Sequence, residues 1–236
     1  MSKIDELRLG FETAYIDGSV VSNNIYRPQF VSNNHKEGKK VLSSIEDELL
    51  VCDGFQISVA FITMNGITPL LQTLKELEKR NIKGEILTTN YLNFSEPKAL
   101  KKLNELSNIT LKMYDVEVAN EGFHTKGYIF RKEEIYHIII GSSNITSVAL
   151  TDNREWNTKL VSTVHETAKE IVTEFNELWN SNYALTFDEF YENYNERYKI
   201  IKHQREVAKQ EEITSIEKYK LQPNSMQIGF IINLKK

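Results

Sequence analysis

Short apolar runs alternate with helix-like stripes along the middle of the chain, and this alternation constrains the fold more than any other feature. The runs at 55–63, 85–89 and 109–116 have the length and apolar content of buried strands. Between them, apolar residues recur every three or four positions, as they do on the buried face of a helix. We therefore predict an α/β fold in which a mixed central sheet is flanked by helices on both faces.

The expected helices are placed by their apolar stripes and by residues that favour helix ends. Stripes at 40–52 and 97–106 predict two of them. A third is predicted to begin at Thr68, which precedes a proline, and its pattern stops at Gly84. Capping-box spacing at 163–166 predicts the start of a fourth helix, which closes the domain.

The same patterns divide the 236 residues into four segments. We expect an N-terminal arm or edge strands at 1–37, the α/β domain at 38–184 and a helical extension or linker at 185–218. This long helical segment carries an aromatic stripe, which is more typical of a core or a subunit contact than of a nucleic-acid stacking platform. Residues 219–236 form the fourth segment.

One predicted hairpin carries the candidate functional residues. The apolar runs at 127–130 and 135–140 indicate its two buried strands. On the first strand the two-residue period places His124 and Lys126 on one face, so a nucleophile or proton carrier lies beside a positive charge. The second strand ends in a glycine and small polar residues at 141–144, a turn whose donors suit a phosphate.

These residues resemble a known motif. His124-x-Lys126 is followed by a Gly-Ser-x-Asn turn that ends at Asn144, and Glu155 lies eleven positions farther along the chain. The arrangement resembles the motif of the phospholipase D superfamily in its single-copy, nuclease-like branch. Arg131 stands five positions after the lysine, where that motif usually has an aspartate. The resemblance implies a phospholipase D-like fold for the α/β domain.

The resemblance also implies a metal-independent phosphodiesterase, a nuclease that needs no cofactor. Hydrolysis of a phosphodiester in two steps requires an in-line nucleophile and an acid for the departing oxygen. The implied roles are nucleophile and acid for His124, phosphate binding for Lys126, Ser142 and Asn144, and support of the imidazole for Glu155.

A single copy of the motif implies a homodimer. Two imidazoles are needed, and no other histidine of the chain is followed by a lysine at the second position and by a similar turn. The economical arrangement is a two-fold dimer in which His124 of each subunit faces the other across one shared site. His137 lies within an apolar strand without such a pattern, and we expect it to be a structural residue of the sheet.

Composition restricts the partners and the location. The formal net charge is −4, so binding to DNA requires a local basic surface. Cys52 is the only cysteine, which excludes an internal disulfide, and the sequence near the motif lacks the spacing of a metal site. The chain has no apolar run of membrane-spanning length and no signal peptide, so we expect a cytoplasmic protein without membrane contact.

The segment at 219–236 predicts the start of a further domain. Residues 221–227 resemble the segment that opens the motor of superfamily 2 DEAD/DEAH-box helicases, in which a glutamine, here Gln227, helps to recognise the adenine of ATP. A phosphate-binding loop is expected shortly afterwards, in a downstream part of the protein. We therefore expect the N-terminal part of a helicase involved in restriction, repair or defence. The alternative is a module that binds nucleic acid and dimerises without cleaving.

Overall fold

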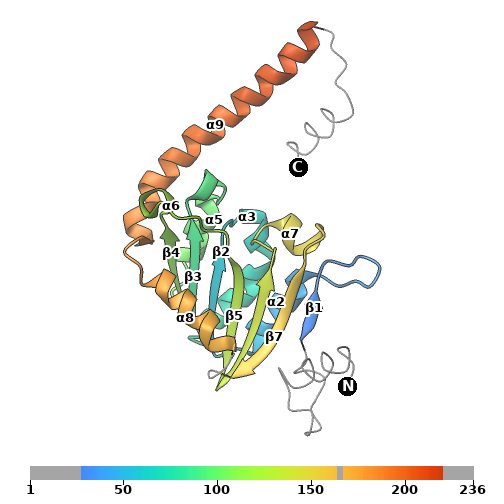
Figure 1. The fold of residues 1–236 in the computed structure, drawn as a ribbon, viewed down its shortest axis with the longest axis vertical. Helices are drawn as coiled ribbons and strands as arrows, with labels where there is room; N and C mark the ends of the chain where they lie inside the picture. The colour runs from blue at the N-terminus through green and yellow to red at the C-terminus, as the bar shows by residue number, and fades with distance from the viewer. Residues whose placement is uncertain (1–27, 164–166, 220–236) are drawn as a thin grey trace, which may run out of the picture. The chain divides into compact units, whose positions relative to one another are not determined.

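The computed structural model describes residues 28–163 and 167–219, which are coloured in Figure 1. The chain separates into two compact units, one that ends at Tyr194 and one that begins at Asn195. The first unit contains the sheet, and the second contains most of helix α9 (Phe187–Tyr219). None of the helices in the described ranges is both long enough and apolar enough to cross a membrane.

The described strands form one eight-stranded mixed sheet in the order β1-β7-β6-β5-β2-β3-β4-β8. β2, β3 and β4 are parallel, as expected of strands joined by crossover helices, and the other neighbouring strands are antiparallel. The predicted mixed sheet and the predicted hairpin, which is β5–β6, are confirmed. The strands are β1 (Gln29–Val31), β2 (Gly54–Val59), β3 (Lys83–Thr89), β4 (Ile109–Tyr114), β5 (Lys126–Lys132), β6 (Ile135–Gly141), β7 (Asn157–Thr163) and β8 (Ala184–Thr186).

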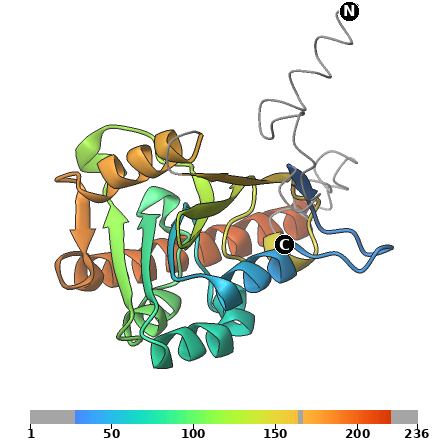
Figure 2. The same ribbon diagram turned by 90° about the horizontal axis from the view of Figure 1, so that it is seen from below.

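Helices cover both faces of the sheet, as predicted. Helices α2, α4 and α5 lie on one face, and α8 lies on the other (Figures 1 and 2). Short helices and 3₁₀ turns occupy the loops between strands. In chain order the helices and 3₁₀ turns of the first unit are α2 (Val41–Val51), α3 (Met64–Ile67), η2 (Thr68–Leu70), α4 (Leu71–Lys79), η3 (Tyr91–Asn93), α5 (Pro97–Asn104), α6 (Val116–Ala119), α7 (Ser147–Thr151) and α8 (Thr167–Trp179).

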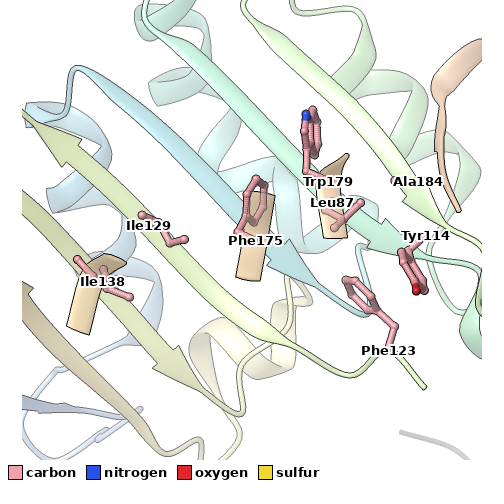
Figure 3. Close-up of a cluster of buried hydrophobic side chains, with 9 residues drawn as sticks. Leu87, Tyr114, Phe123, Ile129, Ile138, Phe175, Trp179 and Ala184 are labelled. Carbon is pink, nitrogen blue, oxygen red and sulfur yellow. The ribbon is translucent and has the colours of Figure 1, made fainter. Parts of the chain in front are cut away.

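An aromatic and aliphatic cluster closes the face of the sheet under α8 (Figure 3). Phe175 and Trp179 of α8 stack with ring centroids 5.7 Å apart, and Ile129 and Ile138 of the hairpin belong to the same cluster. Burial of each such side chain stabilises the fold by about 1.5–3 kcal/mol. The cluster therefore fixes the hairpin against α8. Its members are Leu87, Tyr114, Phe123, Ile129, Ile138, Ala168, Phe175, Trp179 and Ala184.

The structure corrects several element boundaries inside the domain. The helix expected at Thr68 begins earlier, because the Thr63 side chain accepts a hydrogen bond from the Gly66 N–H at 3.2 Å and caps α3. The strand expected at 155–161 begins at Asn157, so Glu155 precedes it. The sequence patterns missed β8, α6 and α7, because each is too short to show a periodicity.

The outer segments lie partly outside the described residues. Of the arm expected at 1–37, residues 28–37 are described, and they contain the edge strand β1. The capping box expected at 163–166 falls mostly on residues outside the described ranges. Phe190 and Tyr194 of α9 are buried in the first unit, so this unit extends beyond the domain end expected at residue 184.

A buried carboxylate joins α2 to strands β6 and β7. Glu48 Oε2 lies 2.8 Å from Nδ1 of His137, and Glu48 Oε1 forms an ion pair with Lys159. Burial raises the pKa of Glu48, but the hydrogen bonds and charges of His137 and Lys159 outweigh burial and hold the pKa below its usual value. These contacts give His137 the structural place in the sheet that we expect from the sequence.

Glu48→Gln is expected to lower the free energy of unfolding by about 3 kcal/mol at neutral pH, because it leaves the Lys159 ammonium half-buried without its carboxylate. Since the folded-state pKa of Glu48 is lowered, this stabilisation is present above about pH 4.5, the usual value, and is lost as the pH falls through the folded-state pKa. Urea unfolding of both proteins from neutral to acidic pH measures the difference. Glu105→Gln removes an exposed ion pair with Lys102 and should change little; equal effects of the two substitutions would contradict the prediction.

Candidate active site

The strand register brings several loops to one edge of the sheet, the upper edge in Figure 1. Val59 at the end of β2 pairs with Lys126 at the start of β5. Gly141 at the end of β6 pairs with Asn157 at the start of β7. Because β3 and β4 run parallel to β2, the loops that follow them lie at the same edge. The predicted motif residues all lie in these strand ends and loops.

Lys126 and His124 form a close pair at the start of β5. The Lys126 residue is 8% exposed, and its Nζ lies 2.6 Å from Nδ1 of His124 and 2.9 Å from the His124 carbonyl oxygen. His124 itself is exposed, and the rings of Phe61 and Tyr91 meet its imidazole edge-on, with ring centroids 6.2 and 6.4 Å away. His124 was expected on the strand, but it precedes the strand by two residues because β5 begins at Lys126.

The electrostatics of this pair favour an uncharged imidazole. Although His124 is exposed, partial desolvation by the residues around the ring lowers its pKa, and the nearby Lys126 ammonium lowers it further. Burial also lowers the pKa of Lys126, whereas the carboxylate of Glu155 acts to raise it. The His124 imidazole is therefore largely neutral at neutral pH, which is the form that can act as a nucleophile or a base.

Ser142 holds Glu155 at this edge of the sheet. The Ser142 hydroxyl donates a hydrogen bond to Glu155 Oε2 and accepts one from the Trp156 N–H at 3.1 Å. Within the described part of the chain, the hydrogen-bond partner of Glu155 is thus Ser142, and that of the His124 ring is Lys126. The expected support of His124 by Glu155 stays a prediction.

Asn144 lies in the turn after β6 and is anchored to the end of β2. Its Oδ1 accepts a hydrogen bond from the Phe61 N–H at 3.1 Å, which directs the side-chain NH₂ group to act as a donor for a phosphate. A parallel bridge between Ile62 and Ile145 holds the turn in place. Gly66 permits this close approach, because a Cβ there would lie 2.2 Å from the Ile145 carbonyl oxygen.

Two residues that the sequence patterns did not single out, Tyr128 and Asn157, support the turn from within the core. The Tyr128 hydroxyl donates to the Ser143 carbonyl at 2.8 Å, and burial raises the pKa of Tyr128, so the hydroxyl stays protonated. The Asn157 side-chain amide donates to the Ser143 hydroxyl at 2.9 Å. One signal was available, because Tyr128 follows Lys126 by two positions on a buried strand and its hydroxyl needs a partner there.

Gly141→Ala is expected to displace the segment that carries Glu155, because a Cβ at this position would lie 2.2 Å from the Trp156 carbonyl oxygen and 2.4 Å from Asn157 Oδ1. Overpacking of this kind costs about 1–3 kcal/mol of unfolding free energy. Urea unfolding measures the stability, and the emission of Trp156 in a Trp179→Phe background measures the displacement. Gly54→Ala is the matched control, since its nearest heavy atom would be 3.6 Å away; a Gly141→Ala protein as stable as this control would contradict the prediction.

The other groups considered in the sequence are the metal ligands, Cys52 and Gln227. The described residues contain no group of three or more His, Cys, Asp or Glu side chains that could hold a metal ion. The Cys52 thiol is buried and donates to the Leu49 carbonyl at 3.3 Å, and burial raises its pKa to about 11. Gln227, the expected adenine contact, lies outside the described residues.

Comparisons with known proteins show the family and the fold of the chain. Residues 53–179, more than half of the chain, match the protein family described as "Cardiolipin synthase, PLD-like domain". No curated protein matches the sequence.

Solved structures share the fold at low sequence identity. NucT from Helicobacter pylori is 15% identical with a TM-score of 0.53, and the match covers 68% of this chain and 99% of NucT. Nuc from Salmonella typhimurium, a phospholipase D family member, is 17% identical with a TM-score of 0.52, over 68% of this chain and 98% of its own. Phosphatidylserine synthase from Haemophilus influenzae is 13% identical with a TM-score of 0.52, over 80% of this chain and 46% of its own. The family match over residues 53–179, together with this shared fold, shows that the chain belongs to the phospholipase D-like family.

Proposed function

We propose that the chain is a metal-independent phosphodiesterase that cleaves DNA through a phosphohistidine intermediate at a dimer interface. The observation that carries the proposal is the Lys126–His124 pair, with 2.6 Å between Nζ and Nδ1, at the same sheet edge as the Ser142–Glu155 pair. Binding of a phosphate alone needs only a cation and neutral donors. A neutral imidazole beside that cation adds a nucleophile, and membership of the phospholipase D-like family supports the same chemistry.

The proposed reaction uses two imidazoles. Nε2 of one His124 attacks phosphorus while the P–O bond to the leaving strand breaks, which gives a phosphohistidine. The second His124, as an imidazolium, donates a proton to the departing oxygen. It then accepts a proton from the water that attacks phosphorus and breaks the P–N bond. Lys126 and Asn144 stabilise the negative charge on the non-bridging oxygens in both steps.

Substrate binding would release the attacking imidazole from Lys126. When the Lys126 ammonium donates to Nδ1, the proton of a neutral His124 ring is on Nε2, the atom that must attack. A phosphate oxygen is a stronger acceptor than a neutral ring nitrogen, so we expect it to draw Lys126 away. The ring proton then moves from Nε2 to Nδ1, and the Nδ1–H donates a hydrogen bond to Glu155, which leaves the Nε2 lone pair free.

Exposed apolar side chains near His124 support the homodimer. Tyr91, Leu92 and Phe94, which we call the β3 patch because they follow β3, are 39%, 48% and 44% exposed. The Tyr91 ring contacts the His124 imidazole. Apolar surface gathered in this way is favourable to bury against a partner. A two-fold axis beside the β3 patch would also bring the two imidazoles together.

DNA as the substrate and a helicase as the larger protein are proposals that rest on the sequence resemblances. A chain with a net charge of −4 must bind DNA through a local basic surface. ATP would serve a downstream motor, in which Gln227 contacts the adenine, and a cytoplasmic location fits this role.

Cleavage of DNA in the presence of EDTA tests the proposed function. The wild-type protein should release products from labelled DNA, and His124→Ala should not. If both proteins bind DNA and form dimers but neither cleaves, the chain is a binding and dimerisation module. Cleavage that appears only after a divalent ion is added would contradict metal independence.

Leu92→Asn is expected to weaken the dimer about tenfold without loss of monomer stability. Leu92 has a φ of 53°, a left-handed conformation that asparagine tolerates better than leucine. The substitution therefore relieves backbone strain while it removes apolar area from the β3 patch. Sedimentation equilibrium measures the dissociation constant. Leu50→Asn, at a leucine of α2 that is 46% exposed, is the matched control; equal dissociation constants for the two variants would place the interface elsewhere.

A further inference from the structure

An exposed aromatic pair lies next to the catalytic turn. The Trp156 N–H donates to the Ser142 hydroxyl at 3.1 Å, and the Trp156 carbonyl accepts from the Ser142 N–H at 3.2 Å. Trp156 is nevertheless 74% exposed. Phe30 of β1 is 65% exposed and meets the indole edge-on, with ring centroids 6.1 Å apart. Trp156 directly follows Glu155. Large aromatic side chains that are exposed to solvent next to a candidate site residue such as Glu155 indicate a binding surface.

A hollow of about 460 Å³ opens beside the indole. Its walls are the loop 32–36 of the N-terminal arm and the side chains of Asp152, Arg154, Glu155 and Trp156. Volumes of about 300–1,000 Å³ are typical of small-ligand sites. The hollow is therefore large enough for one nucleotide unit and is continuous with Glu155.

Two cationic side chains of the hollow can bind an anion. Lys36 and Arg154 are exposed, and neither forms an ion pair with another residue in the described ranges. The acidic side chains of the hollow, Asp152 and Glu155, accept hydrogen bonds from hydroxyl groups. The two cations are thus available for charge-assisted hydrogen bonds to phosphate oxygens.

The arm that forms one wall is held by a buried asparagine. The Asn33 amide donates to the carbonyls of Ala149 and Asn153 at 2.9 and 2.7 Å, and its Oδ1 accepts the Val41 N–H at 2.9 Å. These three bonds connect the arm to α2 and to α7 and the residues after it. A wall that is already ordered costs less entropy when a ligand binds.

We propose that this hollow, the Trp156 subsite, receives an unpaired base of single-stranded nucleic acid whose neighbouring phosphate enters the site at His124. The inference rests on the proposed function and specifies its substrate class. A base of a single strand can stack on the indole, whereas the bases of a duplex stack on one another. Lys36 and Arg154 bind the flanking phosphates. A second copy of this chain is a less favourable occupant, because a two-fold contact would bring the same cations of both copies together.

Fluorescence quenching tests the Trp156 subsite directly. The chain has two tryptophans, so Trp156 is the only emitting indole in a His124→Ala/Trp179→Phe protein, which also cannot cleave. Titration with a short oligothymidylate in EDTA should quench the emission saturably, and a duplex of the same length should quench it far less. Absence of saturable quenching by the single strand would overturn the subsite.

Binding of a labelled oligonucleotide, followed by anisotropy, provides a second measurement on proteins that retain Trp179. In the His124→Ala background, Trp156→Ala should weaken binding of the single strand about tenfold, and Trp156→Phe should restore most of it. Arg154→Ala should weaken binding more than Lys98→Ala, which removes an exposed lysine of α5. Unchanged affinity of Trp156→Ala, with or without a loss of dimer, would assign the surface to something other than nucleic acid.

Different experimental results would contradict the Trp156 subsite and the proposed function. If the wild-type protein does not cleave but Trp156→Ala still weakens binding of the single strand, the function fails and the subsite stands. If the wild-type protein cleaves single strands and duplexes equally, and Trp156→Ala cleaves as well, the subsite fails and the function stands.

Discussion

His124→Ala is expected to lose DNA cleavage by at least about a thousandfold, because the substitution removes the proposed nucleophile and the proposed acid together. In an equal mixture with wild-type protein, the rate should fall to about a quarter of that of wild type at the same total concentration. Random pairing makes about one dimer in four entirely wild type, and only such a dimer contains two His124 imidazoles.

The mixture distinguishes a shared site from two independent ones. Subunits that act alone would give about half of the wild-type rate, and that result would overturn the twin-imidazole mechanism. Differently tagged subunits, purified through both tags, confirm that exchange is complete. His203→Ala in α9 is the matched control, since His203 lies in the second unit, and its mixture with wild type should keep the full rate.

Lys126→Met is expected to slow cleavage by about 100-fold to 1,000-fold, because it removes the ammonium that we propose stabilises the charge on the phosphate. It should also raise the pKa of His124. Desolvation and the Lys126 charge together hold the pKa of His124 below 6.5. The His124 imidazole of the wild-type protein therefore stays neutral down to a lower pH, and the acid limb of kcat/KM lies below pH 6.5. Without the ammonium the acid limb should move up towards 6.5, and burial, the larger cause, should keep it from moving the whole way.

An NMR titration of the His124 ring measures this shift independently of activity. Lys112→Met is the matched control, because Lys112 is half-buried on β4 and its ammonium donates to the Trp179 carbonyl at 2.9 Å rather than to the site. The control should leave the His124 titration unchanged. If Lys126→Met also leaves it unchanged, the 2.6 Å contact between Nζ and Nδ1 does not govern the imidazole.

Local patterns in the sequence were enough to predict most of the sheet and helices. Strands covered on both faces are continuous apolar runs, which is why the runs at 127–130 and 135–140 predicted β5 and β6. The errors are local in origin as well. Thr63 competes with Thr68 as a helix cap, and the three residues of β8 leave no periodicity to detect.

Sequence spacing also predicted which candidate site residues lie together, where those residues are close in the chain. His124 and Lys126 are two positions apart, so an extended segment places their side chains on the same side, and in the structure they are in contact. The hydrogen-bond partner of Glu155 could not be predicted from sequence spacing. Its bond to Ser142 spans two segments that meet only because β6 pairs with β7.

The sequence by itself therefore determined the class of fold, the order of its elements and the spacing of the residues that resemble a phosphate-handling motif, because these depend on neighbours along the chain. Only the tertiary structure decided that β5 lies between β2 and β6, that Asn144 bonds to Phe61 and that Trp156 is exposed beside the arm. The physical reason is that an apolar pattern specifies burial but not the partner. Which strands pair, and which aromatic side chain is left in water, are set by contacts between residues far apart in the sequence.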